Sequence, residues 1–113
     1  MGVFSGVFPI LEGKEDGARA FAAETIGARL KDFEALQERS NVTRETWALQ
    51  ETPMGSFMVV WFEGDVEKAF SDLAGDNSDF GSWFKGQVKD LTGVDLGAPP
   101  EGPLPAILVD WRR

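Results

Sequence analysis

The chain has 113 residues, enough for one domain of ordinary size, and its 42% hydrophobic content allows a real core. Its net charge of −8 makes nucleic acid and anionic membranes poor partners, because both repel an acidic surface. The absence of cysteine, histidine and tyrosine excludes disulfides, thiolate nucleophiles and serine–histidine hydrolysis. It also removes the standard haem anchors, which leaves Met54 or Met58 or a less usual ligand.

No cofactor or metal is expected from these absences. Carboxylates alone can hold magnesium, but no ligand spacing such as that of an EF-hand loop supports it. Residues 1–16 lack the basic start, the long apolar stretch and the cleavage site of a signal peptide. No apolar run approaches the roughly 20 residues that cross a bilayer. We therefore expect a cytoplasmic protein, a single domain over residues 1–113, that does not enter a membrane.

The first half of the chain predicts a strand followed by a long helix. Residues 2–10, GVFSGVFPI, are rich in Val and Phe and alternate loosely, which is typical of a strand. From residue 14 to about residue 39 the apolar residues recur at three- and four-residue steps, which predicts a helix. Gly27 lies inside this helix and indicates a kink or a close approach to the sheet.

A hairpin follows the helix. Residues 41–52 alternate polar and apolar side chains and predict a strand, with Arg44 and Glu45 on opposite faces. Residues 53–55, PMG, predict a turn, and residues 56–64 predict the second strand of an antiparallel pair. The first of these two strands is the more polar, so we expect it at an edge of the sheet. The strands at 2–10 and 56–64 should be central.

Two shorter helices and a last strand complete the chain. Asp65 is expected to cap a helix over residues 66–74, and Asn77 or Ser78 a second helix that runs to Gly93. The Pro- and Gly-rich residues that follow predict a long surface connection. AILVDW, at the end of the chain, predicts a closing strand over residues 106–111.

The predicted order is β-α-β-β-α-β, with the second helical unit split in two. This order is the ferredoxin-like plan of the α+β class, in which helices cover one face of a four-stranded antiparallel sheet. FMVVWF, residues 57–62, is apolar at both odd and even positions, so both faces of that strand need to be buried. We expect a homodimer in which one set faces the partner, either Phe57, Val59 and Trp61 or Met58, Val60 and Phe62.

The opening strand, the long helix, the hairpin ETWALQETPMGSFMVVWFEGD, the helix with WFKGQVKDLTGVDL and the closing strand together resemble the dimeric α+β-barrel proteins. In that superfamily two ferredoxin-like sheets pack face to face. The hairpin is most similar to small bacterial members related to antibiotic-biosynthesis-monooxygenase-like and stress-responsive barrel proteins. The resemblance implies the fold and the dimer but no catalytic residue, because the haem-degrading relatives depend on a histidine that this chain lacks.

Aromatic and charged residues are the candidates for a ligand pocket between helices and sheet. They are Arg44, Trp47, Trp61, Trp83, Phe84 and Asp110. Each also has a plainer interpretation. The tryptophans and Phe84 fit a core or a dimer interface, Arg44 an exposed edge-strand cation, and Asp110 an exposed strand end. An inward-facing Asp110 would have a raised pKa and could accept a proton.

Three classes of function remain. The first is binding of a small apolar or aromatic molecule inside the barrel. The second is a cofactor-independent, monooxygenase-like enzyme, in which an electron-rich substrate does its own chemistry. The third is a structural or interaction module without a ligand. We rank binding first, because few groups here can do acid–base work and the aromatic rings can stack on an apolar guest.

Overall fold

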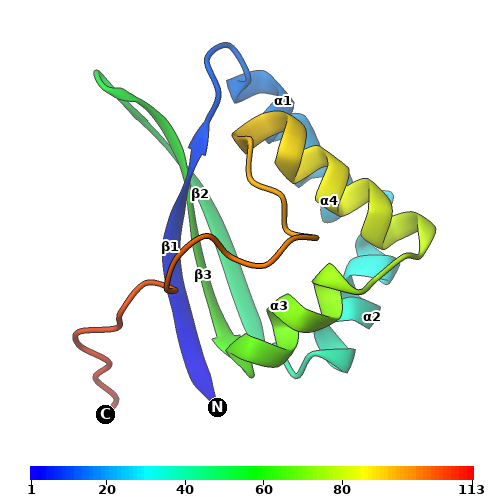
Figure 1. Ribbon diagram of the computed structural model, residues 1–113, viewed down its shortest axis with the longest axis vertical. Coiled ribbons are helices and arrows are strands. Elements are labelled where there is room, and N and C mark those ends of the chain that lie inside the picture. Colours follow the sequence, from blue (N-terminus) through cyan, green and yellow to red (C-terminus); the bar gives the residue numbers. More distant parts are fainter.

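The computed structural model describes residues 1–113 as four helices and a three-stranded antiparallel sheet, which confirms the α+β class. The strands are β1 (Gly2–Ile10), β2 (Arg44–Thr52) and β3 (Gly55–Gly64), in the order β1-β3-β2. The helices are α1 (Glu15–Thr25), α2 (Leu30–Arg39), α3 (Val66–Ala74) and α4 (Asp79–Thr92). All four helices lie on one side of the sheet (Figure 1).

The predicted hairpin is confirmed, and its turn is stabilised by a threonine. The Thr52 hydroxyl donates to the Gly55 carbonyl at 2.7 Å and accepts from the Met54 amide at 3.1 Å. Gly55 has a φ of 124°, a conformation that a residue with a Cβ rarely adopts. Local chemistry therefore fixes the register between β2 and β3, in which Trp47 lies opposite Val60.

The helix expected over residues 14–39 is in fact two helices. The regular pattern ends at Thr25, and α2 begins at Leu30. Gly27 lies in the break, where an added Cβ would approach the Ala23 carbonyl oxygen to 2.7 Å. The two shorter helices agree better with the sequence. Asp65 accepts from the Lys68 amide to cap α3, and Ser78 caps α4.

The predicted fourth strand over residues 106–111 is wrong, and so is the central position of the first strand. The segment has no regular structure, and β1 is an edge strand paired only with β3. Pro105 lies beside Gly6 of β1, whereas Arg112 pairs with Glu63 on the face that bears no helices. The segment therefore crosses the edge of β1 instead of running along it (Figure 1). Leu108 remains 90% exposed.

The alternation along the strands decides which residues meet the helices. Phe62 stacks on Phe4 in the buried layer, so Met58, Val60 and Phe62 face the helices. The opposite side of the sheet, here called the helix-free face, bears no helix. It consists of Val3, Ser5, Val7 and Pro9 of β1, Arg44, Thr46, Ala48 and Gln50 of β2, and Phe57, Val59, Trp61 and Glu63 of β3.

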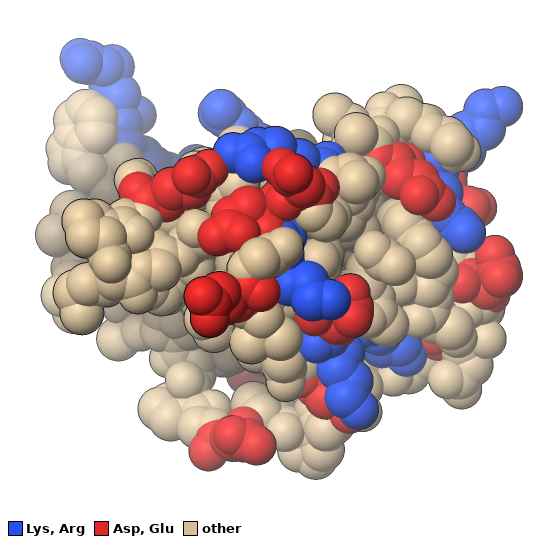
Figure 2. Space-filling view, turned by 90° about the horizontal axis from the view of Figure 1, so that it is seen from above, with Lys and Arg blue, Asp and Glu red and all other residues tan.

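The charged surface mixes both signs. Figure 2 shows acidic and basic side chains lying side by side, and Arg19, for example, pairs with both Asp16 and Glu51. None of the four helices combines the length and the apolar composition that a membrane span requires. Ion pairs of this exposed kind contribute little to stability.

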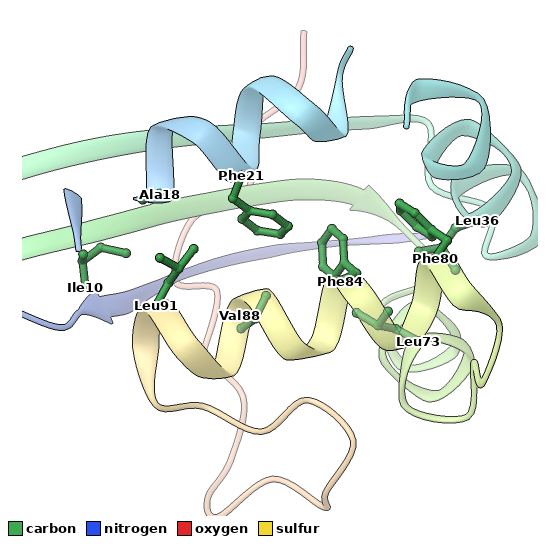
Figure 3. Packing of buried hydrophobic residues seen from close by; sticks show 9 residues of the cluster. All are labelled: Ile10, Ala18, Phe21, Leu36, Leu73, Phe80, Phe84, Val88 and Leu91. Atoms are coloured by element: carbon green, nitrogen blue, oxygen red, sulfur yellow. The ribbon is translucent and has the colours of Figure 1, made fainter. Parts of the chain in front are cut away.

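The hydrophobic core lies between the sheet and the helices and is rich in aromatic rings. Figure 3 shows its nine buried side chains, which are Ile10, Ala18, Phe21, Leu36, Leu73, Phe80, Phe84, Val88 and Leu91. Phe21 of α1 and Phe84 of α4 meet edge to face, with ring centroids 5.1 Å apart. Because these two residues come from helices distant in the sequence, their contact ties the helical layer together.

Two glycines of α4 provide a test of this packing. Gly86 is exposed and an added Cβ would meet nothing within 4 Å, so Gly86→Ala should raise the free energy of unfolding by about 0.5–1 kcal/mol. Gly81 is buried, and an added Cβ would overlap Asp76, so Gly81→Ala should lower it despite the same gain in helix propensity. Urea unfolding of both variants measures the difference. Equal stabilisation by the two substitutions would contradict the packing of α4 described here.

Candidate functional site

An apolar cavity of about 100 Å³ lies between the sheet and the helices. All four helices and all three strands contribute to its wall, and 18 of its 22 lining residues are hydrophobic. Aromatic rings make up much of this wall: Phe4, Phe8, Phe21, Phe33, Trp47, Phe62, Phe70 and Phe84. The wall suits a small apolar guest, since most binding pockets combine apolar surface with a few polar groups.

The floor of the cavity is the helix-facing side of the sheet. Gly6, Val60 and Trp47 lie opposite one another across β1, β3 and β2. Gly6 presents no side chain, and Phe4 and the neighbouring Pro105 occupy the space beside it. Across this row the side chains range from none at Gly6, through the small Val60, to the large Trp47, which makes the floor uneven.

Glu45 is the only ionisable residue in the wall. Its Oε1 accepts a hydrogen bond from Gln37 Nε2 at 2.7 Å, and its Oε2 accepts one from Trp47 Nε1 at 2.6 Å. Burial raises the pKa of the Glu45 carboxyl, and the hydrogen bonds from Trp47 and Gln37 offset only part of that rise. A carboxyl group with a raised pKa inside an apolar wall is the main polar feature of the cavity.

The other polar residues of the wall, besides Gln37, are satisfied within the protein. Ser40 donates its hydroxyl to Asp72 at 3.1 Å, and Thr92 donates its hydroxyl to the Val88 carbonyl at 2.7 Å. Glu45 differs, because two carboxylate oxygens offer about four acceptor sites and only two are used. It is therefore the wall group best able to accept a further hydrogen bond from a guest.

Two of the six residues predicted from the sequence lie in the cavity wall. The Trp47 indole stacks on Phe21 with ring centroids 5.3 Å apart while its N–H reaches Glu45. Phe84 lies edge-on to the same Trp47 ring at 5.8 Å. The structure thus brings Trp47 and Phe84 together from β2 and α4, 37 positions apart in the sequence.

The other four predicted residues lie outside the cavity wall. Trp83 packs beside the core with the Arg29 guanidinium 4.3 Å from its ring centroid. Arg44 and Trp61 lie together on the helix-free face, with the guanidinium 5.8 Å from the ring. Asp110 is exposed in the C-terminal segment, outside any strand, so it does not face an enclosed space.

Glu45 and Gln37 are polar wall residues that were not predicted from the sequence. The signal for Glu45 was present, because it alternates with Trp47 and so shares the inward face of β2. Gln37 gave no comparable signal, since it lies on α2 among exposed charged residues. The structure contains no group of three or more acidic residues that could hold a metal ion.

Comparisons of this chain with protein-family models, with curated proteins and with solved structures find no match. The resemblance to the dimeric α+β-barrel proteins therefore rests on the sequence pattern alone. What the cavity does has to be argued from its own geometry and chemistry.

The raised pKa of Glu45 predicts how stability depends on pH. A carboxyl whose pKa is higher in the folded than in the unfolded chain takes up a proton on folding. Its stabilising contribution is complete below the unfolded pKa of about 4.3 and is lost as the pH rises through the folded value. The wild type should therefore lose stability relative to Glu45→Gln as the pH rises from about 4.3 through the raised pKa of the folded protein.

Urea unfolding of the two proteins at a series of pH values checks this. Glu34→Gln, on the exposed side of α2, is the matched control for the loss of one carboxyl group. A pH-dependent difference no larger for Glu45→Gln than for Glu34→Gln would mean that the Glu45 carboxyl is not desolvated in the folded protein.

Proposed function

We propose that the protein binds a small apolar or aromatic molecule in the cavity between its sheet and its helices. The observation that carries this proposal is an aromatic wall interrupted by a single carboxyl group, Glu45. The apolar wall would supply affinity through burial, and Glu45 would orient a guest through one hydrogen bond. At about 100 Å³ the cavity holds a guest of only a few heavy atoms without adjustment, since a cavity of about 150 Å³ accommodates benzene.

The same carboxyl group supports a second candidate function, a cofactor-independent enzyme of the monooxygenase-like kind. A general base needs a pKa near the working pH, and burial moves that of Glu45 in this direction. Glu45 could then accept a proton from an electron-rich substrate held against Trp47. Binding remains the first proposal, because no second acid–base group lies in the wall.

Binding of benzene as a probe tests the first proposal. Benzene at 100 times its Kd should raise the free energy of unfolding by about 2.7 kcal/mol, with some adjustment of the wall. Val60→Phe should abolish this effect by filling the cavity, whereas Val59→Phe, one residue away on the helix-free face, should keep it. Thermal unfolding of the wild type and of the two variants, with and without benzene, measures the stabilisation by benzene in each protein.

If Val60→Phe does not fold, Val60→Ala replaces it and should strengthen benzene binding by enlarging the space. Equal benzene stabilisation of the Val60 and Val59 variants would place the probe outside the cavity and reject the proposal.

We further propose that the protein is a homodimer in which two helix-free faces pack together, as in the superfamily that the sequence resembles. The support is the apolar centre of this face, where Val7, Val59 and Trp61 lie with no helix over them. Val7 is 60% exposed, and Val59 and Trp61 are half-buried, so part of this apolar surface is open to solvent within one chain. Exposed apolar surface of this kind is typical of protein interfaces.

The size of the face fits a second copy. Three strands of about nine residues make a surface of roughly 30 × 14 Å, or about 420 Å² in projection for each copy. Two copies contribute about 840 Å². The relief of the side chains, together with Leu108, Val109 and Trp111 of each copy, raises this toward the ~1,200 Å² of a stable interface.

Sedimentation equilibrium at micromolar concentration should give a mass near twice the 12.4 kDa of one chain. Val7→Glu should weaken the dimer by about 100-fold or more, because it would place an unpaired charge in the interface. This variant should still fold, since Val7 is exposed within one chain. Ser82→Glu, at an exposed position on α4, is the control and should leave the mass unchanged. A wild-type mass of a single chain throughout this range would refute the dimer.

A further inference from the structure

Three of the other four partly buried carboxylates form ion pairs, and the fourth, Glu15, accepts a hydrogen bond from Ser56. Asp76, with a side-chain exposure of 9%, pairs with Arg39, and Glu63, with 23%, pairs with Arg112. Asp72 pairs with Lys68. Glu45 forms no ion pair, and its two partners, Trp47 and Gln37, are neutral donors. The charge of its ionised form is thus compensated by hydrogen bonds alone.

An ionised carboxylate that is withdrawn from water and has no counter-ion is energetically costly. Two hydrogen bonds to neutral groups reduce that cost but leave the net charge in the wall. A cation that enters the cavity would pair with Glu45 and offset part of that cost, and it would use an acceptor site that Gln37 and Trp47 leave free.

The surroundings of Glu45 favour an organic cation over a metal ion. Its neighbour across the sheet is Phe62, and the Trp47 ring lies against Phe33 at 6.0 Å and Phe21 at 5.3 Å. Aromatic faces attract an ammonium group, and their hydrocarbon surface also accepts an alkyl or aryl chain. A metal ion would need several oxygen ligands, and no group of three or more acidic residues that could hold one is present.

We infer that the guest of this cavity is a small organic amine, with its ammonium group at Glu45 and its hydrocarbon part among the aromatic side chains. This inference rests on the proposed binding function and names the chemical class of its ligand. A neutral alcohol of the same size could donate a hydrogen bond to Glu45 but would leave the carboxylate charge without a counter-ion. The net charge of −8 also raises the local concentration of cations around the protein.

Butylamine and 1-butanol test the inference, because they have the same chain and differ only in the terminal group. Binding is followed by NMR of the indole N–H groups in the full chain, which has four tryptophans. The Trp47 signal, assigned with Trp47→Phe, reports binding beside Glu45 because that N–H donates to its carboxylate. At a pH above the raised pKa of Glu45, where the carboxylate is ionised, butylamine should bind the wild type about tenfold or more tighter than 1-butanol, as expected for a charge-assisted hydrogen bond.

Glu45→Gln keeps the size of the side chain and removes its charge, so it should abolish the preference for the amine. Glu34→Gln, which removes a charge from the exposed side of α2, should retain the preference of the wild type. If Glu45→Gln does not fold, the ratio of the two affinities in the wild type decides by itself.

The outcomes separate the two proposals. Equal affinity for the two probes, with the Trp47 signal moving in both cases, would overturn the amine and leave the apolar binding function standing. Amine binding that leaves the Trp47 signal unmoved, or that survives unchanged in Glu45→Gln, would overturn the inference by placing the amine on the acidic surface. Failure of both probes and of benzene to bind would overturn the amine inference and the binding function together.

Discussion

Strand β3 is apolar on both faces, and the chain provides one layer of helices to cover only one of them. The helix-facing side of β3 closes the core through Phe62 and forms the floor of the cavity through Met58 and Val60. The other side leaves Val59 and Trp61 beneath no helix. The cavity and the helix-free face therefore have one origin, the asymmetric covering of a strand that is apolar on both sides.

The cavity lies among aromatic rings between the helices and the sheet. Phe21, Phe33, Trp47 and Phe84 contact one another mainly edge to face, a geometry that holds ring centroids 5 to 7 Å apart. Glu45 lies at this imperfectly filled layer, where an apolar residue would pack more stably. A polar group at such a position is consistent with the proposed binding site at Glu45.

Local features could be predicted from the sequence, whereas the closing strand could not. The caps at Asp65 and Ser78 and the turn before Gly55 were predictable, because they depend on a few neighbouring residues. The closing strand over residues 106–111 was not, although its composition is typical of a strand. A strand needs a partner edge in the right position, and the path set by Pro105 and Arg112 carries this segment across β1.

By itself the sequence determined the α+β class, the hairpin, the helix caps and the exclusion of chemistry that needs cysteine, histidine or tyrosine, because periodicity, turn residues and composition are local properties. Only the tertiary structure decided that Trp47 and Phe84 share a wall, that Trp61 and Arg44 lie on the opposite face, and that Glu45 has no counter-ion. These features depend on which elements meet in space. A counter-ion can come from any part of the chain, so its absence beside Glu45 could be recognised only once every element had its place.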